Sequence, residues 1–156
     1  MKFNHLIQIN DPLNPLIDTM TRAELWSGLV LRAESPKLFM PHLDECLLTE
    51  QSADSVKREL RYGQLRISDV VTYEPQHRVH YHVPAQGDIP TSSMSMTIEE
   101  PEEGALFVRF EYDDGAPDDV SGEQAFYDQF RRSAYEEADI DTIRIIRELS
   151  VRGSIQ

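Results

Sequence analysis

Hydrophobic and polar positions change their spacing several times along the chain. Residues 2–9 alternate between the two kinds, which predicts a β-strand because successive side chains of a strand point to opposite faces. The motif TRAELWSGLVLRAESP, residues 21–36, has helical spacing instead, and Thr21 with Glu24 matches a capping box at its start. Two prolines bracket the following KLFM, so we expect a second short helix of about one turn there.

Six short runs rich in Val, Ile, Thr, Tyr and Phe follow, separated by turn signals. The runs lie at residues 42–50, 55–63, 64–75, 77–84, 93–101 and 105–112. Links this short join antiparallel neighbours, because parallel strands need crossovers of about a dozen residues or more. Together with the first strand, the runs predict a seven-stranded antiparallel meander.

The last third of the chain returns to helical spacing. Ser121 and Gln124 match a second capping box, and a stripe that we expect to face the interior follows, at four-residue steps in its first part. The stripe consists of Phe126, Phe130, Ala134, Ala138, Thr142, Ile145, Ile146 and Leu149. This predicts a helix of about 27 residues, or about 40 Å, that ends near Gly153. Residues 1–156 are therefore expected to form a single α+β domain.

This order of elements resembles the START-like or SRPBCC superfamily, which has the birch-pollen-allergen fold, and within it the AtaL-like family of unknown function. The motifs HLIQIND, TRAELWSGLVLRAESP, RELRYG and TYEP carry the resemblance, which covers essentially the whole chain. It implies a helix-grip fold, with a seven-stranded curved antiparallel sheet around a long C-terminal helix and a cavity between them for a hydrophobic or amphipathic ligand. In the wider superfamily, members bind lipids, sterols or polyketides, catalyse cyclisation or hydrolysis, or activate a chaperone. The AtaL-like branch offers no catalytic residues to transfer.

Charge and composition narrow the classes of partner. The formal net charge is −13, and residues 99–141 alone contain fifteen acidic and three basic residues. A negative field of this size repels phosphate backbones, so we expect no nucleic-acid partner. No apolar run approaches the roughly 20 residues of a membrane span, and the start lacks a leader pattern, so we expect a cytoplasmic protein without membrane insertion. Cys46 is the only cysteine, which excludes an intrachain disulfide and a CxxC pair.

The run HRVHYHVP, residues 77–84, holds three of the five histidines. Alternation divides its side chains between the two faces of a strand. Those expected to face the helix are His77, Val79, Tyr81 and Val83. His80 and His82 then point to solvent, and because no third ligand is visible we expect no metal site. His77 and His5 fall on apolar faces and are either acid/base groups in the cavity or hydrogen-bonded core histidines.

Arg58 lies on the apolar face of its strand and has two interpretations. It either holds a ligand carboxylate in the cavity, or it passes the sheet edge or pairs with an acid such as Asp69. The full set of predicted ligand-binding residues is Trp26, Arg58, Tyr62, His77, Val79, Tyr81, Met94, Met96, Val108, Phe110, Phe126 and Phe130. The facing of residues 65–74 stays open, because two alternating sets compete there and a bulge would exchange them.

No GxSxG, HExxH, GxxxxGK[ST] or GxGxxG motif is present, and we assign no catalytic residue, cofactor or metal ligand. The acidic stretch YDDGAPDDVSGE does not fit a calcium loop and is expected to be a solvated hinge. Three function classes remain. We favour a non-catalytic carrier or sensor of a small hydrophobic molecule, with or without an acidic group. The alternatives are a cyclase- or hydratase-type enzyme that uses His77, Arg58 and a tyrosine on a polyketide-like substrate, and an interaction module whose acidic C-terminal region docks on a basic partner.

Overall fold

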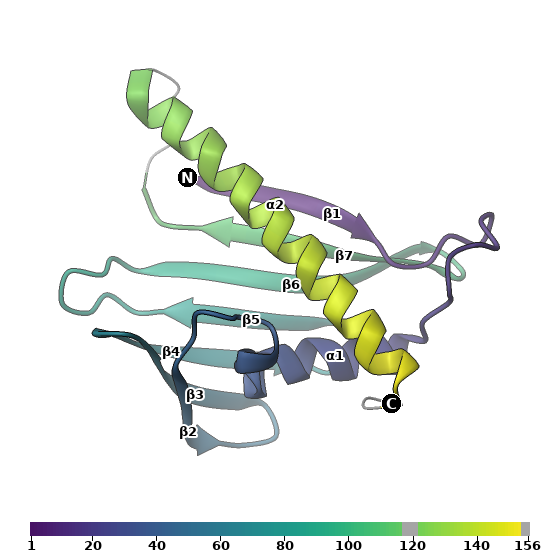
Figure 1. Ribbon diagram of the computed structural model, residues 1–156, viewed down its shortest axis with the longest axis horizontal. Coiled ribbons are helices and arrows are strands. Elements are labelled where there is room, and N and C mark those ends of the chain that lie inside the picture. Colours follow the sequence, from purple (N-terminus) through teal and green to yellow (C-terminus); the bar gives the residue numbers. More distant parts are fainter. Residues whose placement is uncertain (117–121, 154–156) are drawn as a thin grey trace.

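The structure of the protein is a computed structural model that describes residues 1–116 and 122–153. It contains seven strands and two α-helices (Figure 1). The elements in chain order are β1 (Lys2–Gln8), α1 (Arg22–Glu34), the 3-10 helix η1 (Pro36–Leu38), β2 (Glu45–Gln51), β3 (Ser55–Tyr62), β4 (Leu65–Glu74), β5 (Arg78–Val83), β6 (Ser92–Glu102), β7 (Ala105–Asp113) and α2 (Gly122–Val151).

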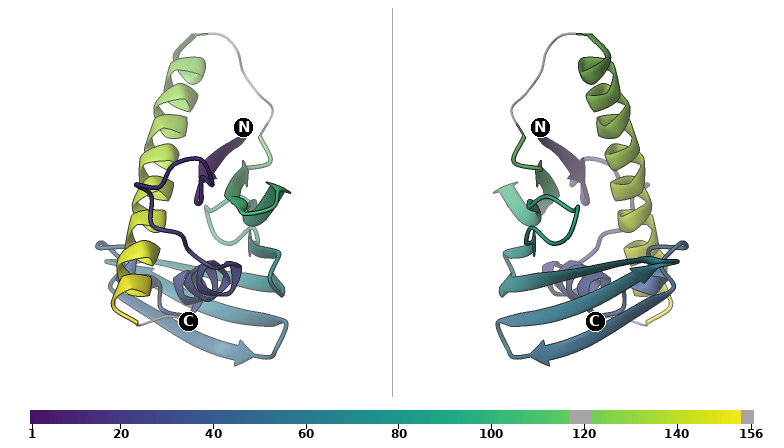
Figure 2. Two further views of the ribbon diagram at one scale, coloured as in Figure 1. Left: turned by 90° about the vertical axis from the view of Figure 1, so that its right-hand side faces the viewer. Right: turned by 90° about the vertical axis from the view of Figure 1, so that its left-hand side faces the viewer.

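All seven strands form one sheet in the order β1-β7-β6-β5-β4-β3-β2, and every neighbouring pair is antiparallel. The predicted meander is therefore confirmed, and β1 closes it by pairing with β7 at one edge. Both helices lie on the same, concave face of the curved sheet (Figure 2). This arrangement is the helix-grip fold.

The first helix begins and ends as its sequence indicates. The Thr21 side chain accepts a hydrogen bond from the Glu24 N–H, and the Glu24 side chain accepts one from the Thr21 N–H, each at 3.0 Å. The expected second short helix is only the three-residue η1, because Pro36 starts this turn and Pro41 follows soon after it. The Ser121 cap proposed for α2 lies outside the described residues.

The C-terminal half of α2 packs against α1. Gly28 of α1 lies so close to Ile146 that a Cβ atom at position 28 would stand 2.4 Å from the Ile146 Cγ2. Only glycine permits this approach of the two helices. Arg147 also ties this half to the segment after β1, where it donates to the carbonyls of Ile9 and Asp18.

The N-terminal half of α2 turns a different face to the sheet than the pattern predicted. Phe126 and Phe130 are 75% and 68% exposed, so the prediction that they close the cavity is wrong. A helical turn takes 3.6 residues, so each four-residue step rotates about 40° around the helix, and four steps from Phe126 to Thr142 add up to about 160°. The side chains that face inward in this half are those of Asp128, Arg131 and Tyr135.

Strand facing places the interior on the predicted side of β5. Val79 and Tyr81 are buried, whereas His82 is exposed and His80 lies half-buried on the outer face. In β4, Asp69 and Val71 are buried, so the set of positions 67, 69, 71 and 73 faces the helices. This settles the facing that the sequence left open.

Candidate functional site

One end of the interior, beneath α1 and the C-terminal half of α2, is an apolar core. Its fully buried members include Ile9, Leu25, Leu29, Ala33, Val56, Val71, Val79, Met96, Val108, Phe110 and Ile146. Four of the predicted ligand-binding residues are among these fully buried members, namely Val79, Met96, Val108 and Phe110. They face the interior as expected, but they pack against other core side chains.

Arg58 lies at the border of this core, and each of its three guanidinium nitrogens donates a hydrogen bond to the protein. Its Nε and Nη2 donate to the two carboxylate oxygens of Asp69 at 2.8 and 2.6 Å, and Nη1 donates to the Ala33 carbonyl at 2.9 Å. Burial alone would lower the pKa of Arg58, but the hydrogen bonds and charge of Asp69 raise it. Of its two interpretations, the structure therefore contains the internal ion pair, in which Asp69 occupies the Nε–Nη2 edge of Arg58.

Two guanidinium groups lie over the ring of Tyr81. The Cζ atoms of Arg58 and Arg32 lie 5.0 and 5.2 Å from the centre of its ring, within the range of a cation–π interaction. The Tyr81 hydroxyl and the Arg32 Nε are both shielded from solvent, and neither has a hydrogen-bond partner among the described residues. These are polar groups without the partner that burial normally requires.

A second buried polar group is centred on Asp139, in the middle of α2. Its side chain is 1% exposed and accepts hydrogen bonds from the Tyr112 hydroxyl at 2.7 and 2.8 Å and from the His5 Nε2 at 2.7 Å. Burial raises the pKa of Asp139, and the hydrogen bonds from His5 and Tyr112 oppose that shift. Burial and the nearby Asp139 charge raise the pKa of Tyr112. The Tyr112 ring stacks on Tyr135 at a centroid distance of 4.1 Å, which fixes the hydroxyl in place.

Beside these groups, the N-terminal half of α2 and the concave face of the sheet enclose a pocket of about 350 Å³. The wall residues come from the N-terminus, β5, the loop before β6, β6, β7 with the residue after it, and α2. They are Met1, Tyr81, Val83, Ile89, Pro90, Ser92, Ser93, Met94, Tyr112, Asp113, Asp114, Arg131 and Tyr135. Much of the wall is apolar, and Tyr81 and Tyr112 connect it to the polar groups behind.

A protein-family model described as acetylaranotin biosynthesis cluster protein L, AtaL, matches residues 7–153. The chain belongs to the AtaL family. A search of curated proteins finds no match.

Solved structures place this AtaL-family chain in the START-like, or SRPBCC, fold. The di-domain ARO/CYC StfQ from the steffimycin biosynthetic pathway is similar with a TM-score of 0.70 and 8% identity, over 99% of this chain and 52% of StfQ. The Zhui aromatase/cyclase from Streptomyces sp. R1128 gives 0.61 and 10%, over 97% and 94% of the two chains. Human STARD10 gives 0.63 and 9%, over 98% and 66%. The chain thus spans about half the length of StfQ, and identities this low show the fold alone.

The predicted ligand-binding residues of this AtaL-family protein lie in several separate places in the structure. Tyr81 and Met94 line the pocket. Trp26 packs edge-on against Tyr73 at a centroid distance of 6.3 Å, and the half-buried Tyr62 donates to the Met40 sulfur. Neither of these two is among the residues that line the pocket.

His77 was expected to face the cavity, and this prediction is wrong. The residue is exposed in the turn between β4 and β5. The strand begins one residue later, at Arg78, so the alternation that would have turned His77 inward does not reach it. His5 takes the interior position instead, through its bond to Asp139.

Several wall and interior residues were not singled out from the sequence, namely Arg32, Arg131, Tyr135 and Asp139. The last three residues can be found from the helical period of the sequence. Positions 128, 131, 135, 139, 142 and 146 recur every three or four residues and stay on one face, but polar side chains at the first four hid this stripe from a search for apolar residues. Arg32 lies one turn after Gly28, on the buried face of α1.

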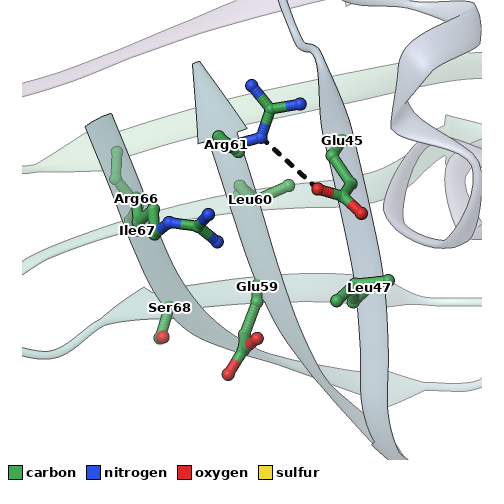
Figure 3. Close-up of a pocket in the computed structure, with 8 residues that line it drawn as sticks. All are labelled: Glu45, Leu47, Glu59, Leu60, Arg61, Arg66, Ile67 and Ser68. Atoms are coloured by element: carbon green, nitrogen blue, oxygen red, sulfur yellow. Dashed lines mark hydrogen bonds and ion pairs between the residues drawn. The ribbon is translucent and has the colours of Figure 1, made fainter. Parts of the chain in front are cut away.

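The outer face of the sheet carries a second, smaller depression across β2, β3 and β4. Its volume is about 140 Å³, and charged side chains such as Glu45, Glu59, Arg61 and Arg66 surround it (Figure 3). Arg61 donates to Glu45 at 3.3 Å. On the same face, His80 bonds to the Ser95 hydroxyl at 2.7 Å. No group of three or more potential metal ligands occurs within residues 1–116 and 122–153, and no helix there is long and apolar enough to cross a membrane.

Proposed function

We propose that the protein binds one small hydrophobic or amphipathic molecule in the pocket beneath the N-terminal half of α2. The observation that carries the proposal is the pocket itself, which joins an apolar wall to buried polar groups without partners. Ligand sites commonly combine an apolar lining with a few polar groups that fix orientation. The shared fold supports the proposal only by analogy.

Native mass spectrometry of the protein purified from its own host tests this function. We expect a bound small molecule in about one copy per chain, recovered by denaturing extraction. Val83→Trp fills the pocket and is expected to abolish the bound mass, because Val83 lines the wall. His82→Trp is the matched control, since the adjacent His82 is exposed on the opposite face. A mass retained by Val83→Trp, or a wild-type pocket that stays empty when offered apolar probes, contradicts the proposal.

A second candidate function is a cyclase-type enzyme, supported by the convergence of His5, Tyr112 and Asp139. A histidine hydrogen-bonded to a buried carboxylate is suited to moving a proton, and Tyr112 adds a second donor beside it. His77 is exposed and Arg58 is paired with Asp69, so neither is part of this hypothesis. Conversion of a compound from a host extract over many turnovers, lost in His5→Gln, supports the enzyme. Binding of that compound without conversion supports the carrier.

A further inference from the structure

Two arginines approach Tyr81, and their environments differ in one decisive respect. Arg58 is satisfied by Asp69 and by the Ala33 carbonyl. Arg32, which is only 8% exposed, has no ion pair with a carboxylate among the described residues, and its Nε is buried without a hydrogen-bond partner. Its guanidinium lies over the Tyr81 ring, and Tyr81, Tyr112 and Asp139 act electrostatically on its charge.

A buried guanidinium without an anion is costly, because burial removes the water that would otherwise solvate its charge. The contact with Tyr81 offsets part of this cost. Asp139 is the acidic group that acts electrostatically on Arg32, but its two oxygens already accept hydrogen bonds from Tyr112 and His5. Arg32 therefore has a positive charge and an open Nε–H donor, and the Tyr81 hydroxyl beside it is a second open donor.

We propose that the molecule in the pocket carries an acidic head group, such as a carboxylate, that binds Arg32 and the Tyr81 hydroxyl. This inference rests on the proposed function, because the pocket leads to these groups through Tyr81. The apolar body of the ligand lies along Val83, Pro90 and Met94. A guanidinium and a hydroxyl together match the acceptor geometry of a carboxylate.

The charge of the whole molecule makes this local cation necessary for such a ligand. The formal net charge is −13, and Asp113 and Asp114 lie in the pocket wall, where Arg131 and the N-terminal amine are already paired with Asp114. This field opposes the entry of an anion. An acidic ligand is then held by the contact with Arg32 inside the protein, whereas its neutral counterpart depends only on the apolar wall.

A matched pair of fluorescent probes tests the inference. Anilinonaphthalene sulfonate and N-phenylnaphthylamine share their aromatic body, and only the first carries an acidic group. In Arg32→Met we expect the anionic probe to bind about 10- to 100-fold more weakly, the range of a lost charged hydrogen bond. The neutral probe should change by less than about twofold, since methionine keeps an apolar side chain of similar length. Arg61→Met, on the outer face, is the control for the loss of one positive charge.

The outcomes separate this inference from the proposed function. If both probes bind but Arg32→Met weakens them equally or leaves both unchanged, the role of Arg32 is overturned and the binding pocket stands. If neither probe binds, or if Val83→Trp leaves both unaffected, the proposed function itself fails. Arg32→Met should not lower the melting temperature, because it removes an unpaired buried charge. If that variant does not fold, Tyr81→Phe replaces it, and a loss of anionic-probe affinity of about threefold or more supports the inference, whereas an unchanged affinity overturns it.

Discussion

The two halves of α2 have opposite relations to the sheet. In the C-terminal half, Ile143 and Ile146 are buried against α1 and the core, and Arg147 ties the helix to the segment after β1. In the N-terminal half, apolar Phe126 and Phe130 face away from the sheet while polar side chains face the pocket. The comparison shows that one continuous helix secures the fold at one end and frames a candidate binding site at the other.

The largest predicted difference in stability between the two halves follows from deleting one apolar side chain in each. Ile146→Ala is expected to lower the free energy of unfolding by about 2–5 kcal/mol, because it opens a cavity at a fully buried position. Phe130→Ala should change it by no more than about 0.5 kcal/mol, since its ring is mostly exposed. Urea unfolding at neutral pH measures both values. Similar losses for the two variants would mean that Phe130 is covered in solution and that the contrast between the halves is wrong.

An intermediate effect is expected where the C-terminal half contacts α1. Gly28→Ala places a methyl group against Ile146, and overpacking of this kind costs about 1–3 kcal/mol. Alanine is the better helix former by about 1 kcal/mol, so a net loss of about 0–2 kcal/mol should remain. The double variant Gly28→Ala/Ile146→Ala provides the check. It should lose less than the sum of the single losses, because the second change removes the clashing atoms.

The smallest effect concerns the link that holds the N-terminal half. Asp114 accepts hydrogen bonds from Arg131 at 2.9 Å, from the N-terminal amine and from the Ala116 N–H. Burial alone would raise the pKa of Asp114, but these hydrogen bonds lower it to about 2. A lowered pKa means that the ionised carboxylate stabilises the folded state above about pH 4, and that this contribution is lost as the pH falls through about 2.

Asp114→Asn should therefore reduce stability by about 1 kcal/mol at pH 7, a value discounted for the partial exposure of the side chain. The loss should fall to about half at pH 3, because the carboxylate of the unfolded chain, with a pKa of about 4, is mostly protonated there while that of the folded protein is still ionised. Urea titrations of both proteins at the two pH values measure it. A loss that is independent of pH would show that the Asp114 charge does not hold this half of the helix.

The fold was predictable because each element carries its own local signal. Alternation marks the strands, short links impose antiparallel pairing, and the Thr21 capping box starts α1 where expected. The site was only partly predictable. The sequence allowed Arg58 two partners and did not rank them, since the choice of Asp69 depends on the pairing of β3 with β4.

The remaining errors have geometric causes. The apolar stripe of α2 was followed at four-residue steps, which drift around a helix. The inward stripe contains Asp139 and Arg131, and nothing local marks a charged residue as buried. The interaction-module hypothesis stays a prediction, and the exposed Phe126 and Phe130 lie within the acidic region that it concerns.

The close contact between Gly28 and Ile146 makes the long helix a lever with its fulcrum near one end. About 20 residues separate Ile146 from Phe126, or about 30 Å along the axis. A tilt of about 5° at the fulcrum therefore moves the first turns by about 3 Å and leaves the helix contact almost in place. Such a tilt would deepen the pocket for a larger guest and leave the core packed, but it would first break the ion pair between Arg131 and Asp114.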